Sequence, residues 1–258
     1  MSLSGQQVWV LGAGFLGASL EALCRRAGAS VLTFDVNTAA SPHICADTAL
    51  PATFERAVRL GNAAPAAIFC CTATHGGSVA DYRRCYVGTV QALAEVGMAG
   101  RCVFCSSTSL YGGVSERSSV LAEAESLVLQ AGGCVARLAP LYGPGRCELL
   151  RRHLAGEPCL PGAPDRVLNY VHVEDAAMAL LLLAQQAARG IYAVCGESFT
   201  KAAIYPLLER LTGVPTSESR AEPSRRCHTS RPVDAASLRA LGWTPQHLFA
   251  DFVASQLV

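Results

Sequence analysis

Three glycines near the start of the chain have the spacing of a phosphate-binding turn. Gly12, Gly14 and Gly17 follow an apolar strand pattern and lead into a helical pattern. Glycine permits the backbone angles of a tight turn, and without a side chain the backbone and a helix N-terminus can approach a pyrophosphate. The spacing therefore predicts a dinucleotide-binding turn, to which Phe15 and Leu16 also belong.

An acidic residue follows the second apolar run at the distance expected for ribose recognition. Asp35 ends the run 30–34 and lies 18 residues after Gly17. A carboxylate there accepts hydrogen bonds from ribose hydroxyls and repels a 2′-phosphate. Because no basic residue follows within 36–38, we expect NAD as the cofactor in preference to NADP.

The elements that position these residues alternate regularly. Strand patterns cover 7–11, 30–34, 66–71, 101–106 and 134–138, and helical patterns cover 15–27, 51–60, 79–97 and 117–131. Strand–helix alternation implies right-handed crossovers and a parallel sheet covered on both faces. We therefore predict an α/β fold with a doubly wound parallel sheet of the Rossmann type.

The later part of the chain predicts a small second unit. We expect 1–142 to form an NAD-binding Rossmann domain, with 167–195 returning to the same sheet. The segments 143–166 and 196–258 interrupt the alternation. They predict a small C-terminal substrate-binding cap over the carboxyl edge of the sheet, where ligands of this architecture bind.

Composition excludes several classes of function. The chain has 258 residues and a net charge of +1, and its arginine pairs are scattered, so we expect no nucleic-acid partner. The longest apolar run, 176–184, is too short to span a bilayer. The first residues lack the charged and apolar regions of a secretory signal. We expect a soluble, cytoplasmic protein with no membrane partner.

Twelve cysteines are present, and many lie in apolar runs. We interpret them as free, buried thiols. Cys102 and Cys105 are three residues apart in a predicted strand, where they point to opposite faces and are poorly placed to hold one zinc ion. We predict no metal site.

Three further segments give the glycine turn a context. They read VFCSSTSLYG over 103–112, RLAPLYGPGR over 137–146 and NYVHVEDAA over 169–177. With the turn, and in this order, they resemble the extended short-chain dehydrogenase/reductase superfamily of NAD-dependent epimerases and dehydratases. The segment LGWTP over 241–245 is similar to the family's closing segment. The resemblance covers nearly the whole chain.

The resemblance implies further site residues. It places Ser107 at the catalytic serine position and implies an adenine contact from Asp47. The remaining cofactor contacts that we expect are Cys71, Thr72, Ala73 and Ser106. The family also pairs its subunits through the helices that match 79–97 and 117–131, so a homodimer is expected, unless the apolar residues there only face the sheet.

The family's acid–base pair is missing from this sequence. Family members carry a tyrosine and, four residues later, a lysine on the helix after the serine strand. Aligned through Glu125, these positions hold Arg117 and Leu121, and the only lysine in the chain is Lys201, with Glu197 four residues before it. The sequence thus resembles a short, atypical branch that lacks the Tyr-x-x-x-Lys pair.

Two other family positions also differ. Cys85 replaces a helix-borne asparagine, and Leu168 replaces an arginine that binds sugar-nucleotide phosphates in the epimerases. Arg166 lies two residues from Leu168 and is able to substitute for that arginine. Arg225, Arg226 and Arg231 offer guanidinium groups to an anionic substrate or are solvated surface residues. We therefore expect a small-molecule substrate, either neutral or anionic.

Several side chains remain candidates for proton transfer. Tyr111 and Tyr142 lie in loops at the carboxyl edge of the sheet. Each either supplies a phenol for proton transfer or has a structural role in the turn that it forms with the glycine after it. His75 follows the third strand and is either an acid or base or a solvated loop residue. The family residue that matches His172 has a mostly structural role. Ser107 either orients a substrate oxygen or caps a strand end.

Two functions follow from these observations. The first is an atypical NAD-dependent oxidoreductase or epimerase/dehydratase-like enzyme that acts on a small metabolite with Ser107 and without the usual pair. The alternative is a non-catalytic NAD-binding sensor or regulatory protein. Polar groups converging on the nicotinamide position would favour the enzyme, whereas an open, apolar face would favour the sensor.

Overall fold

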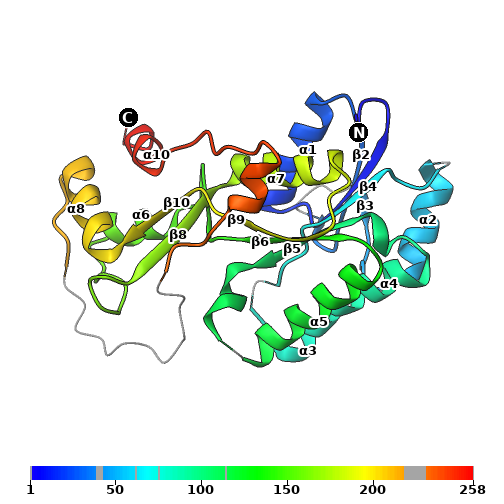
Figure 1. Cartoon of the computed structure of the whole chain (residues 1–258), viewed down its shortest axis with the longest axis horizontal. Helices are drawn as coiled ribbons and strands as arrows, with labels where there is room; N and C mark the ends of the chain where they lie inside the picture. Colours follow the sequence, from blue (N-terminus) through cyan, green and yellow to red (C-terminus); the bar gives the residue numbers. More distant parts are fainter. Residues whose placement is uncertain are drawn as a thin grey trace.

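A seven-stranded parallel sheet forms the centre of the molecule (Figure 1). The structure is a computed structural model, and it describes residues 2–38, 43–61, 63–74, 76–113, 115–217 and 231–257. The strand order is β3-β2-β1-β4-β5-β6-β9, so the direction of winding reverses beside β1. The strands are β1 (Gln7–Leu11), β2 (Ser30–Asp35), β3 (Ile44–Cys45), β4 (Ala67–Cys70), β5 (Cys102–Ser107), β6 (Cys134–Leu138) and β9 (Gly190–Val194).

Helices cover both faces of this sheet, because its strands are apolar on both sides. Val8 and Val10 of β1 lie in one core, while Trp9 and Leu11 lie in the other. The first core includes residues of α1 (Phe15–Arg26), α7 (Val173–Gln185) and α9 (Ala236–Ala240). The second includes residues of α2 (Pro51–Gly61), α4 (Thr89–Glu95) and α5 (Glu116–Gln130). The predicted doubly wound Rossmann fold is confirmed.

A smaller unit lies at one end of the sheet, at the left of Figure 1. Its sheet has the order β10-β8-β7, and an aromatic core with Tyr142 and Phe249 at 5.1 Å between ring centroids fills it. Its elements are β7 (Leu141–Tyr142), β8 (Val167–His172), β10 (Glu197–Thr200), α6 (Glu148–Leu154), α8 (Lys201–Thr212) and α10 (Phe249–Ser255).

Two segments lie elsewhere than the sequence boundaries suggest. Within 167–195, β9 joins the large sheet and α7 packs on its face, whereas β8 pairs with β7 and β10 in the small sheet. Within 196–258, Leu238 and Trp243 pack into the first core of the large sheet. The Trp243 indole donates a hydrogen bond to the Asp175 carbonyl at 3.0 Å. This bond fixes the closing segment to the start of α7.

The helix predicted over 79–97 is interrupted. It consists of α3 (Val79–Arg83), a π-helical turn η2 (Arg84–Gly88) and α4. A Cβ added to Gly88 would lie 3.1 Å from the Ala49 Cβ, so glycine permits the close approach of the neighbouring chain. Single π turns often occur at functional sites.

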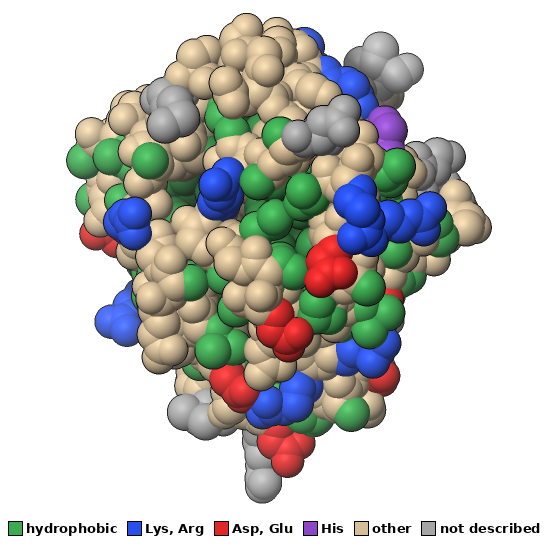
Figure 2. All heavy atoms as spheres, turned by 90° about the vertical axis from the view of Figure 1, so that its right-hand side faces the viewer, with side chains coloured by type: hydrophobic (Ala, Val, Ile, Leu, Met, Phe, Trp, Pro, Cys, Tyr) green, Lys and Arg blue, Asp and Glu red, His purple; other side chains and the backbone are tan. Residues whose placement is uncertain are grey.

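The surface carries both signs of charge. Figure 2 shows basic and acidic side chains interspersed on one face of the molecule, with no continuous basic stripe. On α5, Val120 and Ala124 are buried in the second core, so these apolar residues face the sheet. Within the described residues, no helix is long and apolar enough to cross a membrane.

Candidate functional site

The glycine turn connects β1 to α1, and each glycine has its own steric reason. Gly12 has φ +94°, and an added Cβ would lie 2.7 Å from the Cys71 carbonyl oxygen. A Cβ on Gly17 would overlap the Gly12 carbonyl oxygen. At Gly14, which caps α1, an added Cβ would have no neighbour within 4 Å. Two glycines therefore permit the turn, and the third leaves open space at the helix N-terminus.

Asp35 closes the other side of this turn. Its Oδ2 accepts a hydrogen bond from the Ala13 backbone N–H at 2.8 Å, and its Oδ1 accepts one from the Asn37 N–H at 2.9 Å. The carboxylate thus lies beside the glycine turn at the carboxyl end of β2.

A cavity of about 790 Å³ runs from the glycine turn to the small unit. This volume falls in the range of small-molecule sites. The predicted site residues that line it are Gly12, Gly14, Phe15, Leu16, Asp35, Cys71, Thr72, Ala73, Ser106 and Ser107. They come from four adjacent parallel strands, β2, β1, β4 and β5, and the turns that follow them, so the carboxyl edge of the sheet forms the floor of the cavity.

Three predicted site residues lie outside this lining: Gly17, Asp47 and Tyr111. Gly17 lies against the Gly12 carbonyl, so it permits the tight turn without lining the cavity. Asp47 accepts a hydrogen bond from Arg84 Nε at 2.9 Å and one from the Ala49 N–H at 2.8 Å. In this structure Asp47 thus joins the loop before α2 to the start of the π-helical turn.

The two serines at the end of β5 have different surroundings. The Ser107 hydroxyl accepts a hydrogen bond from the Ser109 N–H at 3.1 Å, as a capping serine does, and Ser107 also lines the cavity. Among the described residues, the buried Ser106 hydroxyl has no hydrogen-bond partner. A buried hydroxyl without a partner is costly, and a ligand in the cavity would satisfy it. Together with the open space at Gly14 and the Asp35 carboxylate, this site fits a dinucleotide.

Arg117 and Leu121, which the sequence aligns with the family's tyrosine and lysine, both lie on α5. Leu121 lines the cavity, while the Arg117 guanidinium carbon lies 5.1 Å from the centre of the Tyr82 ring. Arg117 also donates a hydrogen bond to the Gly77 carbonyl at 2.6 Å. The half-buried Tyr82, on α3, itself lines the cavity. Tyr82 was not expected from the sequence, where its one signal is its place three residues before Cys85.

A second phenol, Tyr86, lines the cavity beside Tyr82, with 5.0 Å between the ring centroids. Tyr86 is 8 % exposed, and burial raises its pKa well above the usual value. Of the two, Tyr82 is therefore the better placed to exchange a proton.

The two tyrosines considered from the sequence have structural partners. The Tyr111 ring lies under the Arg137 guanidinium at 4.9 Å, and Arg137 in turn binds both carboxylate oxygens of Glu125, at 2.9 and 2.6 Å. Tyr142 is buried in the aromatic core of the small unit, and burial raises the pKa of its phenol. Tyr142 does not line the cavity.

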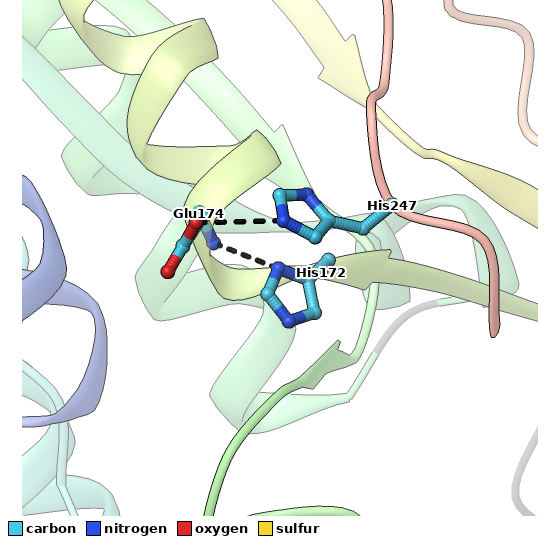
Figure 3. A group of neighbouring side chains, drawn as sticks. All are labelled: His172, Glu174 and His247. Atoms are coloured by element: carbon cyan, nitrogen blue, oxygen red, sulfur yellow. Dashed lines mark hydrogen bonds and ion pairs between the residues drawn. The ribbon is translucent and has the colours of Figure 1, made fainter. Parts of the chain in front are cut away.

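His172, Glu174 and His247 form a group of potential metal ligands. Figure 3 shows the two imidazole rings face to face; their centroids are 4.0 Å apart and their planes differ by 17°. A ring nitrogen binds a metal in the plane of its ring, so stacked rings do not converge on one ion. His172 instead caps α7 by accepting a hydrogen bond from the Glu174 N–H at 3.3 Å, and His247 Nδ1 lies 3.0 Å from a carboxylate oxygen of the buried Asp175. The group joins α7 to the C-terminal segment.

Segments of the small unit contribute cations to the lining of the cavity. Arg146 and Arg166 line it together with Leu160, Val167, Leu168, Asn169 and Tyr170. The Arg146 guanidinium lies over the Phe15 ring at 5.3 Å. Arg166 donates to the Pro161 carbonyl, and its buried Nε has no partner among the described residues. Arg231 contributes its backbone carbonyl, which accepts a hydrogen bond from Asn169 at 3.3 Å. His75, Arg225 and Arg226 lie outside the described residues.

No family model matches the sequence, and no curated protein matches it. Solved structures match over nearly the whole chain. Thermus thermophilus UDP-glucose 4-epimerase in complex with NAD is 23 % identical, with a TM-score of 0.77 and 96 % of each chain covered. The chain has the fold of the NAD-dependent epimerases and dehydratases. Thermotoga maritima UDP-glucose 4-epimerase with UDP-glucose is 18 % identical, with a TM-score of 0.76 and 97 % of each chain covered.

Another similar structure is the enzyme WbmG of Bordetella bronchiseptica in complex with NAD. It is 17 % identical, has a TM-score of 0.79, and matches 98 % of this chain and 93 % of its own. The predicted resemblance to the extended short-chain dehydrogenase/reductase superfamily is thus confirmed for the fold.

Proposed function

We propose that the protein binds NAD along the carboxyl edge of β1, β2, β4 and β5 and is an atypical NAD-dependent enzyme of the epimerase/dehydratase type. One observation carries the proposal: a single cavity joins the glycine turn and Asp35 to polar side chains of the small unit. The NAD complexes of similarly folded proteins support the choice of cofactor. When bound, NAD supplies hydride transfer, and the chain supplies binding, orientation and proton transfer.

The lining of the cavity favours an enzyme over a sensor. Beyond the glycine turn, the polar residues Ser107, Thr108, Tyr82 and Asn169 line the same space. A sensor needs no proton donors there, whereas an enzyme must orient a substrate oxygen and move its proton.

Tyr82 is our candidate for the missing phenol. It lines the cavity from α3, which packs against α5, and the cation beside it comes from Arg117, the residue that the sequence aligns with the family's tyrosine. A guanidinium above the ring favours negative charge on the phenol during proton transfer. In this proposal, Ser107 orients the substrate oxygen and Tyr82 takes or gives its proton.

The charges in the lining favour an anionic substrate. Arg146 and Arg166 line the cavity, and among the described lining residues the one carboxylate is Asp35, at the glycine turn. A guanidinium pairs with carboxylate or phosphate through two parallel hydrogen bonds. We therefore propose a small anionic metabolite as the substrate.

The proposal is tested by soaking or co-crystallising the protein with NAD and a metabolite extract, after a calorimetric titration with NAD and NADP. We expect NAD to bind more tightly than NADP and to lie along the glycine turn, with electron density for a metabolite near Arg146 and Arg166. Tighter binding of NADP, or binding of neither nucleotide, contradicts the proposal.

The oligomeric state stays a prediction. On α5 the exposed residues are polar or small, including Ser119, Ala122 and Ser126. A homodimer that used this face of α5 would therefore bury polar or small side chains there. Light scattering after gel filtration tests it, and a monomer at high concentration contradicts it.

A further inference from the structure

Two cysteine side chains meet in the floor of the cavity. The Sγ atoms of Cys71 and Cys105 are 3.6 Å apart, and both residues are half-buried and line the cavity. Cys71 directly follows β4 and Cys105 lies in β5. In the parallel pairing of these strands Cys70 is opposite Phe104, so Cys71 and Cys105 are the next residues along the same register.

This geometry suits a disulfide. Neighbouring strands lie about 4.8 Å apart, and disulfides join residues whose Cα atoms are about 4.4–6.8 Å apart. The sulfurs must approach one another from 3.6 Å to the bond length of about 2.05 Å. We propose that Cys71 and Cys105 form a dithiol site that an oxidant entering the cavity converts into a reversible disulfide.

A second pair of thiols on the same strands provides a contrast. Cys70 and Cys102 belong to the second core, are 0 % and 1 % exposed, and line no part of the cavity. Consecutive strand residues point to opposite faces, so this pair lies beneath α4 and α5 rather than in the cavity. An oxidant in the cavity therefore reaches Cys71 and Cys105 and not Cys70 and Cys102.

The reaction with a peroxide balances in two steps. The Cys71 thiolate attacks the O–O bond and forms a sulfenic acid, with release of one water after protonation. Cys105 then attacks the sulfenic sulfur, the S–S bond forms, and a second water leaves. The hydrogen bond to Cys71 and burial raise the pKa of the Cys105 thiol, and the same disulfide forms when Cys105 attacks the peroxide first. The two thiols lose two electrons and two protons, and an added dithiol reductant reverses the reaction.

The disulfide also affects the cofactor turn, a consequence that rests on the proposed NAD site. The Cys71 carbonyl contacts Gly12, and the Cys71 N–H donates a hydrogen bond to the Leu11 carbonyl at 2.8 Å. Drawing Cys71 toward Cys105 displaces the Cys71 backbone, against which the glycine turn packs. The disulfide therefore weakens NAD binding on the order of tenfold, and bound NAD disfavours the disulfide at equilibrium by the same factor.

The test treats the folded protein with hydrogen peroxide, alkylates the remaining thiols and maps the peptides by mass spectrometry. We expect a cross-linked Cys71–Cys105 peptide that has lost two hydrogen atoms and that dithiothreitol restores. Cys71→Ser and Cys105→Ser must each abolish it, and Cys70→Ser must retain it; a melting curve of each variant confirms folding. Absence of this cross-link in the wild type, or a cross-link from Cys70 to Cys102 instead, overturns the proposal.

A titration of NAD into reduced and oxidised protein separates this inference from the proposed function. If the reduced protein binds no NAD, the proposed function fails while the mapped cross-link still supports the dithiol site. If the oxidised and reduced proteins bind NAD equally well, the coupling to the cofactor turn is overturned.

Discussion

The Asp35 carboxylate accepts a hydrogen bond from the Ala13 N–H at 2.8 Å, so the end of β2 is fixed to the turn after β1. Residues that bind the ribose and the pyrophosphate of one nucleotide must stay at a fixed distance from each other. This bond keeps the acid and the glycine turn in register at the point where the winding of the sheet reverses.

Asp35→Ala tests the role of the acid in cofactor choice. The substitution removes acceptors for the ribose hydroxyls, and a hydrogen bond to a charged group contributes about 1.5–3 kcal/mol. We expect NAD binding to weaken about tenfold to a hundredfold, and the preference for NAD over NADP to shrink because the repulsion of the 2′-phosphate is lost. Calorimetric titration with both nucleotides measures this. Unchanged NAD affinity in a folded variant would contradict the assignment.

Gly14→Ala and Gly17→Ala separate ligand binding from packing. A Cβ at position 14 meets nothing within 4 Å, while one at position 17 overlaps the Gly12 carbonyl oxygen. Gly17→Ala should therefore lower the free energy of unfolding by about 1–3 kcal/mol or more. Gly14→Ala should leave the melting temperature unchanged and weaken NAD binding, because its methyl group points into the cavity. Equal NAD affinity of Gly14→Ala and wild type would place the pyrophosphate elsewhere.

The sequence predicted the sheet and the glycine turn because their signals are local. Strands apolar on both faces and a glycine pattern do not depend on distant contacts, and most predicted cofactor residues line the cavity. The small sheet was not predicted, because β7 has only two residues and β8 and β10 pair across a long insertion. Tyr82 was missed for a similar reason: its partner Arg117 is distant in the sequence, and only the packing of α3 against α5 brings them together.

Glu125→Ala tests the buried ion pair between Glu125 of α5 and Arg137 of β6. Glu125 and Arg137 have side chains 4 % and 19 % exposed, and removing one partner leaves the other charge partly buried. Breaking such a pair costs about 3–5 kcal/mol, and urea denaturation should report a loss of this order. Glu123→Ala on the same helix is the matched control. It breaks a solvent-exposed pair with Arg83 and should change stability little. Equal losses in the two variants would contradict the difference in burial.

His172 predicts how stability depends on pH. Burial and the neighbouring His247 lower its pKa, while Asp175 and Glu174 oppose this shift. An unfolded histidine has a pKa of about 6.5, so below that pH the unfolded chain binds a proton that the folded protein resists. The contribution of His172 is therefore complete above about pH 6.5 and is lost as the pH falls.

His172→Asn should flatten this acid loss. Asparagine does not titrate there, and it is a favourable N-cap that can accept the Glu174 N–H. Unfolding free energies measured in urea from pH 7 to pH 5 should fall less steeply for the variant than for the wild type. The buried His153, whose pKa is also lowered by burial, still titrates in both proteins. Parallel curves for the two proteins would assign the acid loss to other groups.

Tyr82→Phe tests the proposed proton donor with the first substrate that the liganded structure identifies. A positioned acid or base contributes about 10²–10⁴-fold to the rate, so kcat should fall by a factor in this range while NAD affinity stays constant. Tyr111→Phe is the matched control, because the Tyr111 ring lies under Arg137 and outside the cavity lining. Arg117→Met should also lower kcat, since it removes the cation that lies 5.1 Å from the centre of the Tyr82 ring. Full activity of Tyr82→Phe with loss in Tyr111→Phe would assign the proton to the other tyrosine.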